Sequence, residues 1–378
     1  ISEHDLVRQH LYRPDRWMLM IDQASSEEGL IMAAKQIGSI ARQLHREQIA
    51  SVHIARIMSL LNDALTRKAI ALALGPDSED LAQARGWAWL ALGSEARAEQ
   101  TIVTDQDNAL MVRDASMIPE WLNRAKAINH LLDRMGFPLC KGGVMAMHEH
   151  WCKTLNAWLA EARAWFDHPS PQALLKAQVI LDFRLIAGDP SLVETFEHSL
   201  SEMFAHRPAQ AGVAIHLAKR QALLHRLAAE VLERSVQPLP EAWKIQAYRL
   251  LKRLGLVDGL IRDLKLQGTA LIVDAARLLA LAKLEPGQWM PHGTLERLQW
   301  LELHHGLDRA EVSALSDAFE ALTELRFQRQ LDTAANGQSL QPNQIELLSL
   351  DNSRLWQLRH HVQNIADLRE RLRMDFAT

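Results

Sequence analysis

A short apolar segment, "GWAWLAL" at residues 86–92, limits what this chain can fold into. The segment is aromatic and is bounded by Gly93, so we predict a buried β-strand there. A second strand is predicted over "TDQDNALMVR" at residues 104–113, and a third over the glycine-rich "GFPLCKGGVMAM" at residues 136–147. A helix is expected between the last two strands, at about residues 117–135. These segments predict one small mixed sheet.

Helical periodicity dominates the rest of the chain, and a composition rich in Leu and Ala but poor in Tyr agrees with it. Two long helices are predicted at residues 25–48 and 49–74, and we expect them to form an antiparallel hairpin that ends at Gly75. From residue 150 onward the pattern is helical to the end. The predicted fold class is therefore α+β, with an N-terminal helical hairpin, a small mixed β-sheet and a C-terminal all-helical domain.

The first helices of the C-terminal part are marked by tryptophan and proline. Trp151, Trp158 and Trp165 are spaced seven residues apart, which predicts one buried face of a single amphipathic helix. The next helix is predicted to begin at Pro171 and to end at Gly188. Tryptophans in such a stripe are more typical of a core than of a surface on which nucleic-acid bases stack.

Size, charge and cysteine content exclude several classes of protein. The chain has 378 residues, which exceeds the usual size of one hydrophobic core, so more than one domain is expected. A formal net charge of −4 gives no basic excess for a nucleic-acid backbone. Cys140 and Cys152 are too few for a disulfide framework, so we expect a reduced, cytoplasmic chain. No apolar run is long enough to span a bilayer. The polar first residues are typical of a linker, and we expect sensor domains upstream of it.

Two aspartates one residue apart, Asp105 and Asp107, form the sharpest candidate for a metal site. Successive side chains of a β-strand point to opposite faces, so two residues at this spacing point to the same face. Two ionised carboxylates that lie so close repel one another unless a cation lies between them. Mg²⁺ is the expected cation, since it takes oxygen ligands and shares them with phosphates, and Mn²⁺ is an alternative.

A Gly-Ser pair at Gly93 and Ser94 precedes the aspartates by about ten residues. A glycine lets backbone N–H groups come close to a phosphate, and the serine adds a hydroxyl donor. Arg97 is expected to bind phosphate or to pair with Glu99. Together these residues are typical of nucleotidyl transfer, in which metal ions bind a triphosphate and activate a hydroxyl. The alternative is a capped surface loop with solvated acids.

The segment "LGSEARAEQTIVTDQDNAL" resembles the signature of the DNA polymerase beta-like nucleotidyltransferase superfamily. Within that superfamily, the chain looks like the nucleotidyltransferases that follow cyclic-nucleotide-binding and CBS domains in bacterial signalling proteins. It is distantly similar to the uridylyltransferases of nitrogen regulation. The segments "GFPLCKGGVMAMHEHW", "ILDFRLIAGDPSL" and "QPNQIELLSLDNSRLW" extend the resemblance over nearly the whole chain.

The resemblance implies an organisation and a set of ligands. Residues 1–75 would form a linker and a helical hairpin packed on the core, residues 76–168 the nucleotidyltransferase domain, and residues 169–378 a helical domain like those described as substrate-binding. A divalent metal ion and a nucleoside triphosphate would bind at the Asp105 and Asp107 carboxylates.

The chain also departs from the pattern of the family. Ala96 and Ala98 stand where glycine is expected in the phosphate loop. The superfamily usually adds a third carboxylate from a neighbouring strand, but residues 136–147 contain no acid. Glu149 lies just beyond that segment and Asp182 lies farther along, so a third acid is not assigned.

Four further residues are candidates for substrate contacts. Asp182 lies among apolar residues in the predicted helix, so it pairs with an Arg or Lys of the nucleotidyltransferase domain or points into the cleft. Arg184 is only two positions away and is not the obvious helical partner of Asp182. Lys141 either reaches a phosphate or is solvated in a turn. Lys265 can supply a cation to the triphosphate.

The function predicted from these residues is Mg²⁺-dependent transfer of a nucleoside monophosphate from a nucleoside triphosphate to a hydroxyl. We expect a protein or small-molecule acceptor in a signalling protein, because no basic tract indicates a polynucleotide. Two alternatives remain open. One is a catalytically degenerate module that binds nucleotide and relays the state of the upstream domains, and the other is a transferase directed to tRNA or another nucleic acid.

Overall fold

The computed structural model describes residues 14–75, 85–102, 104–205, 213–234, 236, 238–253, 260–336, 341 and 343–376. These residues form two compact units. Unit 1 comprises residues 1–160 and 179–196, and unit 2 comprises residues 161–178 and 197–378. The α+β class is confirmed, because a four-stranded mixed sheet lies among helices in unit 1 and helices dominate unit 2.

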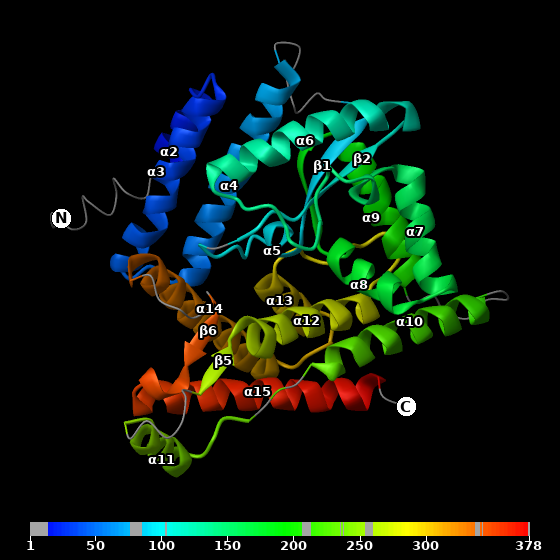
Figure 1. Cartoon of the computed structure of the whole chain (residues 1–378). Coiled ribbons are helices and arrows are strands. Elements are labelled where there is room, and N and C mark those ends of the chain that lie inside the picture. The colour runs from blue at the N-terminus through cyan, green and yellow to red at the C-terminus, as the bar shows by residue number, and fades with distance from the viewer. Residues whose placement is uncertain are drawn as a thin grey trace. The chain divides into compact units, whose positions relative to one another are not determined.

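Several helices accompany the sheet of unit 1. They are α2 (Pro14–Asp22), α3 (Glu27–Arg46), α4 (Ser51–Leu74) and α6 (Ile118–Met135). The hydroxyl of Ser26 accepts a hydrogen bond from the backbone N–H of Gly29 and caps the start of α3. Helix α6 ends at Met135, and Gly136 follows it with a φ of 104°, a conformation that glycine adopts at little cost. Helices α3 and α4 form the expected antiparallel hairpin (Figure 1).

The sheet of unit 1 has the strand order β3-β2-β1-β4. Its strands are β1 (Trp87–Leu92), β2 (Asn108–Val112), β3 (Cys152–Thr154) and β4 (Phe183–Gly188). Strand β1 is antiparallel to both β2 and β4, whereas β2 and β3 are parallel. Every residue of β1 and β2 is buried, which explains why "GWAWLAL" is apolar on both faces.

The strand predicted over residues 136–147 is wrong. This segment forms turns, because Gly143 has a φ of 69° and Pro138 has no N–H to give to a ladder. The sheet takes its remaining strands from β3 and β4 instead.

The uninterrupted helical pattern predicted from residue 150 onward is also wrong. Trp151 belongs to a short 3₁₀ turn, η3 (Glu149–Trp151), and the helix α7 (Leu155–Asp167) begins only after β3. The helix predicted to run from Pro171 to Gly188 ends early, as α8 (Pro171–Ile180), and β4 follows it along β1.

Strand β4 ends at Gly188, a position that tolerates no residue other than glycine. Its φ is 106°, and an added Cβ would stand 2.3 Å from the carbonyl oxygen of Trp87. Glycine alone lets β4 approach β1 this closely.

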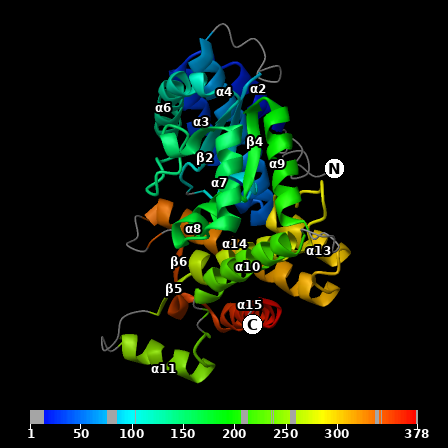
Figure 2. The same cartoon turned by 90° about the vertical axis from the view of Figure 1, so that its right-hand side faces the viewer.

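The described residues of unit 2 are mainly helical, with one short strand pair that the all-helical prediction missed. Beyond α9 (Pro190–Phe204) its elements are α10 (Val213–Glu233), α11 (Ala242–Arg253), β5 (Ile261–Asp263), the π-helical turn η4 (Lys265–Thr269), α12 (Ala270–Lys283), α13 (Thr294–Leu303), α14 (Arg309–Asn336), β6 (Gln344–Glu346), the 3₁₀ turn η5 (Leu347–Ser349) and α15 (Asn352–Phe376). Strands β5 and β6 are antiparallel. Helix α15 runs along α14 and α10 (Figures 1 and 2).

Two arginines, the buried Arg220 and the half-buried Arg371, join helices of unit 2. Arg220 of α10 donates to the carbonyl of Ala282 over 2.7 Å, and Arg371 of α15 pairs with Glu311 of α14 over 2.5 Å. Such charge-assisted bonds fix the order in which the helices pack. Among the described helices, none combines the length and the apolar character that a membrane crossing requires.

Candidate active site

The turn after β1 brings the chain back against Asp107. Gly93 opens a one-turn helix, α5 (Gly93–Ala96), with a φ of 56°. The N–H of Gly93 donates to the carbonyl of Asp182 over 2.9 Å, and the N–H of Leu92 donates to the carbonyl of Asp107 over 2.8 Å. An added Cβ on Gly93 would stand 3.4 Å from Oδ2 of Asp107. The bare backbone of Gly93 therefore leaves space beside this carboxylate.

Asp105 and Asp107 lie just before a strand, and not on it as predicted. Strand β2 begins at Asn108, because the N–H of Gln106 bonds to the carbonyl of Pro138 in the following loop and not to β1. The alternation of side chains nevertheless holds. Gln106 and Asn108 are each 2% exposed, whereas Asp105 is exposed and Asp107 half-buried.

The two carboxylates lie close together, beside a cysteine. Carboxylate oxygens of Asp105 and Asp107 and the Sγ atom of Cys140 all lie within 4.8 Å of one another. Both aspartates were predicted to be metal ligands, whereas Cys140 was not predicted to be a site residue. Its only signal in the sequence is a position in a glycine-rich loop, far from the aspartates along the chain.

A buried network of amide side chains holds this loop in place. The Nδ2 atom of Asn129 on α6 donates to Oε1 of Gln106 over 2.7 Å and to Oδ1 of Asn108 over 3.0 Å. The Nε2 atom of Gln106 donates to the carbonyl of Phe137 over 2.7 Å, and Oδ1 of Asn108 accepts from the N–H of Ala146 over 2.8 Å. Three of these four bonds are buried and the bond to Phe137 is part-buried, so the network fixes both ends of the loop against β2.

Cys140 and Lys141 lie at the turn of this loop. The carbonyl of Cys140 accepts a hydrogen bond of 3.0 Å from the N–H of Gly143. Burial, and to a smaller extent the charge of Asp107, raises the pKa of the Cys140 thiol to about 11. The thiol is therefore protonated at neutral pH. Lys141 is exposed, next to this cluster.

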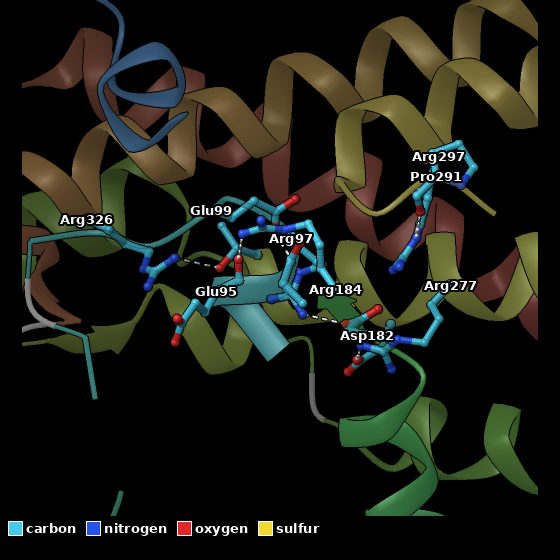
Figure 3. A network of polar contacts seen from close by, with 12 residues as sticks. Glu95, Arg97, Glu99, Asp182, Arg184, Arg277, Pro291, Arg297 and Arg326 are labelled. Atoms are coloured by element: carbon cyan, nitrogen blue, oxygen red, sulfur yellow. Dashed lines mark hydrogen bonds and ion pairs between the residues drawn. The ribbon is translucent and has the colours of Figure 1, made fainter. Parts of the chain in front are cut away.

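Arg97 is held by two acids of the protein. Its Nε atom donates to Glu99 over 2.7 Å, and its NH1 atom pairs with Asp182 over 2.5 Å (Figure 3). Burial by itself would lower the pKa of Arg97, but the attraction of Asp182 and then of Glu99 raises it. Asp182 was expected either to pair with an Arg or Lys or to point into the cleft, and the structure shows the ion pair with Arg97. It places Asp182 in the turn before β4, and not in a helix as predicted.

The buried pair makes a testable prediction about stability. Asp182→Ala is expected to lower the free energy of unfolding by about 2 kcal/mol, less than the usual loss for a broken buried pair because Glu99 still accepts from Arg97. Urea denaturation of wild type and variant measures the difference. A double variant, Arg97→Met with Asp182→Leu, should lose less than the sum of its single substitutions. A loss below about 0.5 kcal/mol for Asp182→Ala would contradict the prediction.

Arg184 anchors the one-turn helix α5 to the hairpin. Its guanidinium makes two bonds to the carboxylate of Asp63 on α4, of 2.7 and 3.0 Å, and donates to the carbonyls of Glu95 and Ala96 over 3.0 Å each. Arg184 thus bonds protein groups that lie up to 121 positions away. Asp63 was missed in the sequence, where its signal was an acid inside an apolar helical segment.

Glu95 is a second acid that was not predicted from the sequence. It is 8% exposed, and its pKa is raised to about 8. Burial is the largest cause, and repulsion from Asp63 and Asp107 adds to it, while Arg184 acts in the opposite direction. A hydrogen bond from the backbone N–H of Asp107 also lowers this pKa. The charge of the Asp107 carboxylate therefore affects the pKa of Glu95, although Glu95 is not part of the cluster of Asp105, Asp107 and Cys140.

Ala98 occupies the left-handed region, with a φ of 55°. This conformation explains why glycine is expected at this position of the loop. The strain on an alanine there is of order 1 kcal/mol. Ala96, the other departure, is buried and helical and carries no such strain.

The effects of substitutions at Ala98 on the free energy of unfolding are expected to depend on this backbone strain. Ala98→Gly should raise the free energy of unfolding by about 0.5 kcal/mol, while Ala98→Val should lower it by at least about 1 kcal/mol. The control is Ala164→Gly in the exposed face of α7, which should lose about 1 kcal/mol. Thermal or urea denaturation measures all three. If Ala98→Gly loses as much as Ala164→Gly, the strain argument fails.

Lys265, the remaining candidate, belongs to unit 2, whereas the other predicted site residues belong to unit 1. It opens the turn η4, where its backbone N–H donates to Oδ1 of Asp263 over 2.9 Å. Unit 2 also contains a cavity of about 770 Å³ between α11 and the β6–η5 segment. Arg249, Lys252 and Arg253 line it, and Lys252 pairs there with Glu346.

Comparison with protein families gives two matches. Residues 35–172 match the family model described as "Putative nucleotidyltransferase DUF294". Residues 251–376 match the family model described as "Putative nucleotidyltransferase substrate binding domain". No curated protein matches the chain. The first match contains Gly93, Asp105, Asp107 and Cys140, and neither match contains Asp182 or Arg184.

Proposed function

Because the chain belongs to the DUF294 family, we propose that it transfers a nucleoside monophosphate from a nucleoside triphosphate to a hydroxyl of a protein or small molecule, with Mg²⁺. The observation that carries the proposal is the convergence of Asp105 and Asp107 beside the bare backbone of Gly93. Metal identity, acceptor and a place in signalling are parts of this proposal.

The two aspartates have the donor chemistry that a hard divalent ion needs. Their carboxylate oxygens lie close enough to share one ion after a small rotation of either side chain. Asp105 is exposed and Asp107 half-buried, so the ion would remain open to a substrate on one side. When bound, the ion would neutralise charge on the triphosphate and on pyrophosphate as it leaves, and would lower the pKa of the attacking hydroxyl.

The residues around the aspartates would hold the triphosphate. Gly93 offers space beside Asp107, and Ser94 is partly exposed at the start of α5. Lys141 would add an exposed positive charge from the facing loop. Arg97 would act indirectly, since its guanidinium keeps the loop in shape through Glu99 and Asp182.

A labelling experiment tests this function. Purified protein would be incubated with Mg²⁺, a cell lysate as the source of acceptors, and each of the four nucleoside triphosphates labelled at the α-phosphate. We expect label in an acceptor with at least one nucleotide and none in the presence of EDTA. Labelling at the same rate in EDTA would contradict the metal-dependent mechanism.

One observation favours the alternative of a non-catalytic nucleotide-binding module. Within the described residues, the third donor beside Asp105 and Asp107 is a thiol and not a carboxylate. If no nucleotide labels any acceptor, yet calorimetry detects binding of a nucleoside triphosphate to the purified chain, the regulatory module replaces the transferase.

A further inference from the structure

Cys140 presents a sulfur atom to the proposed metal site. The cluster in which Sγ of Cys140 lies with oxygens of Asp105 and Asp107 spans at most 4.8 Å. The adjoining residues fix the backbone turn that carries this sulfur. The N–H of Gly143 bonds the carbonyl of Cys140, and a Cβ on Gly142 would stand 3.7 Å from Sγ. The amide network of Gln106, Asn108 and Asn129 then holds the whole loop against β2.

Sulfur changes which cations the cluster prefers. Mg²⁺ takes oxygen ligands almost exclusively, so the thiol adds nothing to its binding. Zn²⁺ and Cd²⁺ bind thiolate strongly and carboxylate as well. Ligands on one tetrahedral Zn²⁺ ion stand roughly 3.5 Å apart, so each side chain needs to move by about 1 Å or less to share the ion.

We propose that Cys140, Asp105 and Asp107 form a site for a thiophilic divalent cation such as Zn²⁺, and that this cation displaces Mg²⁺ and inhibits transfer. On binding, the S–H bond of Cys140 breaks, a metal–sulfur bond forms, and the proton passes to solvent. No oxidation is involved. The cation would occupy the aspartates and draw the loop of residues 137–147 toward them. The inhibition rests on the proposed function, whereas the cation site does not.

Cadmium tests the site directly, because a Cd²⁺–thiolate bond gives a charge-transfer absorption band in the ultraviolet. Titration of the reduced full chain with Cd²⁺ should produce this band in wild type. Cys140→Ser should abolish it, and Asp105→Asn should weaken the affinity at least about 10-fold. The matched control is Cys152→Ser, which removes a buried thiol on β3 and should leave the band unchanged.

A second cation separates this inference from the proposed function. Mn²⁺ binding, followed by electron paramagnetic resonance, reports the carboxylates, and Cys140→Ser should change its affinity less than about 3-fold. This measurement also shows that the variant is folded at the site. A band that persists in Cys140→Ser, or one that depends on Cys152, overturns the inference and leaves the proposed function untouched. A Cd²⁺ band at Cys140 without Mn²⁺ binding supports the site and removes the metal basis of the proposed function.

Inhibition provides the functional test. Zn²⁺ should lower labelling by wild type at concentrations at least about 10-fold below those needed for Cys140→Ser, each compared with its own rate without Zn²⁺. Equal sensitivity of the two proteins would overturn the proposed inhibition through Cys140.

Discussion

Asp107→Asn is expected to reduce nucleotidyl transfer at least about 100-fold, which corresponds to roughly 3 kcal/mol of lost transition-state stabilisation. The substitution keeps the shape of the side chain and removes the charge that would hold the metal ion. Asp107 is half-buried and lies beside Gly93, where the triphosphate would bind. The measurement is the rate of label transfer from the nucleotide identified as substrate, at saturating Mg²⁺.

The control for this prediction is another aspartate of unit 1. Asp133→Asn removes one exposed charge on α6 and should retain the wild-type rate. Asp105→Asn should lose activity as Asp107→Asn does, since the two carboxylates would share one ion. If Asp107→Asn is folded and still transfers label at more than about a tenth of the wild-type rate, the carboxylates do not hold the catalytic metal.

Glu95 should make the metal-free protein less stable as pH rises. The pKa of Glu95 is about 8 in the folded chain against an ordinary value of 4.5, so the folded state binds its proton more tightly than the unfolded state does. The resulting stabilisation is complete below the unfolded pKa and is lost as pH rises through the folded one. We expect the contribution of Glu95 to the free energy of unfolding to fall as pH rises from 5 to 8, by at most about 1.4 kcal/mol per pH unit.

The matching variant is Glu95→Gln, which resembles the protonated acid at every pH. Its stability should change little over the same range, so the difference between variant and wild type isolates Glu95 from the other titrating groups. Urea denaturation in EDTA measures both, because a cation at Asp107 would offset part of the repulsion that Glu95 experiences. Parallel pH profiles for the two proteins would show that Glu95 is ionised in the folded state.

Much of the fold follows from local patterns in the sequence. The helices α3, α4 and α6 and the strand β1 were predicted close to their observed bounds, because a helical or apolar pattern needs no distant partner to be recognised. Strand β4 was taken for a helix, since "FRLIAG" has no alternation and becomes a strand only by pairing with β1.

In the candidate site, too, residues close together in the sequence were predicted, whereas residues that depend on distant segments were not. The spacing of Asp105 and Asp107 predicted neighbouring carboxylates, and they are neighbours even though the strand begins after them. Glu95 was overlooked because its environment depends on Asp63, from a helix that precedes it by some thirty positions. Cys140 was overlooked as a neighbour of the aspartates because nothing in a local pattern tells which loop folds back against them.

By itself the sequence determined the helical framework, the buried strand β1 and the nucleotidyltransferase signature, which all depend on residues close together in the chain. Only the tertiary structure decided that Arg97 bonds Asp182, 85 positions away, and that a thiol stands where a third carboxylate was sought. The physical reason is that a charge or a sulfur acquires its partner from the path of the whole chain, whereas periodicity within one segment specifies only that segment.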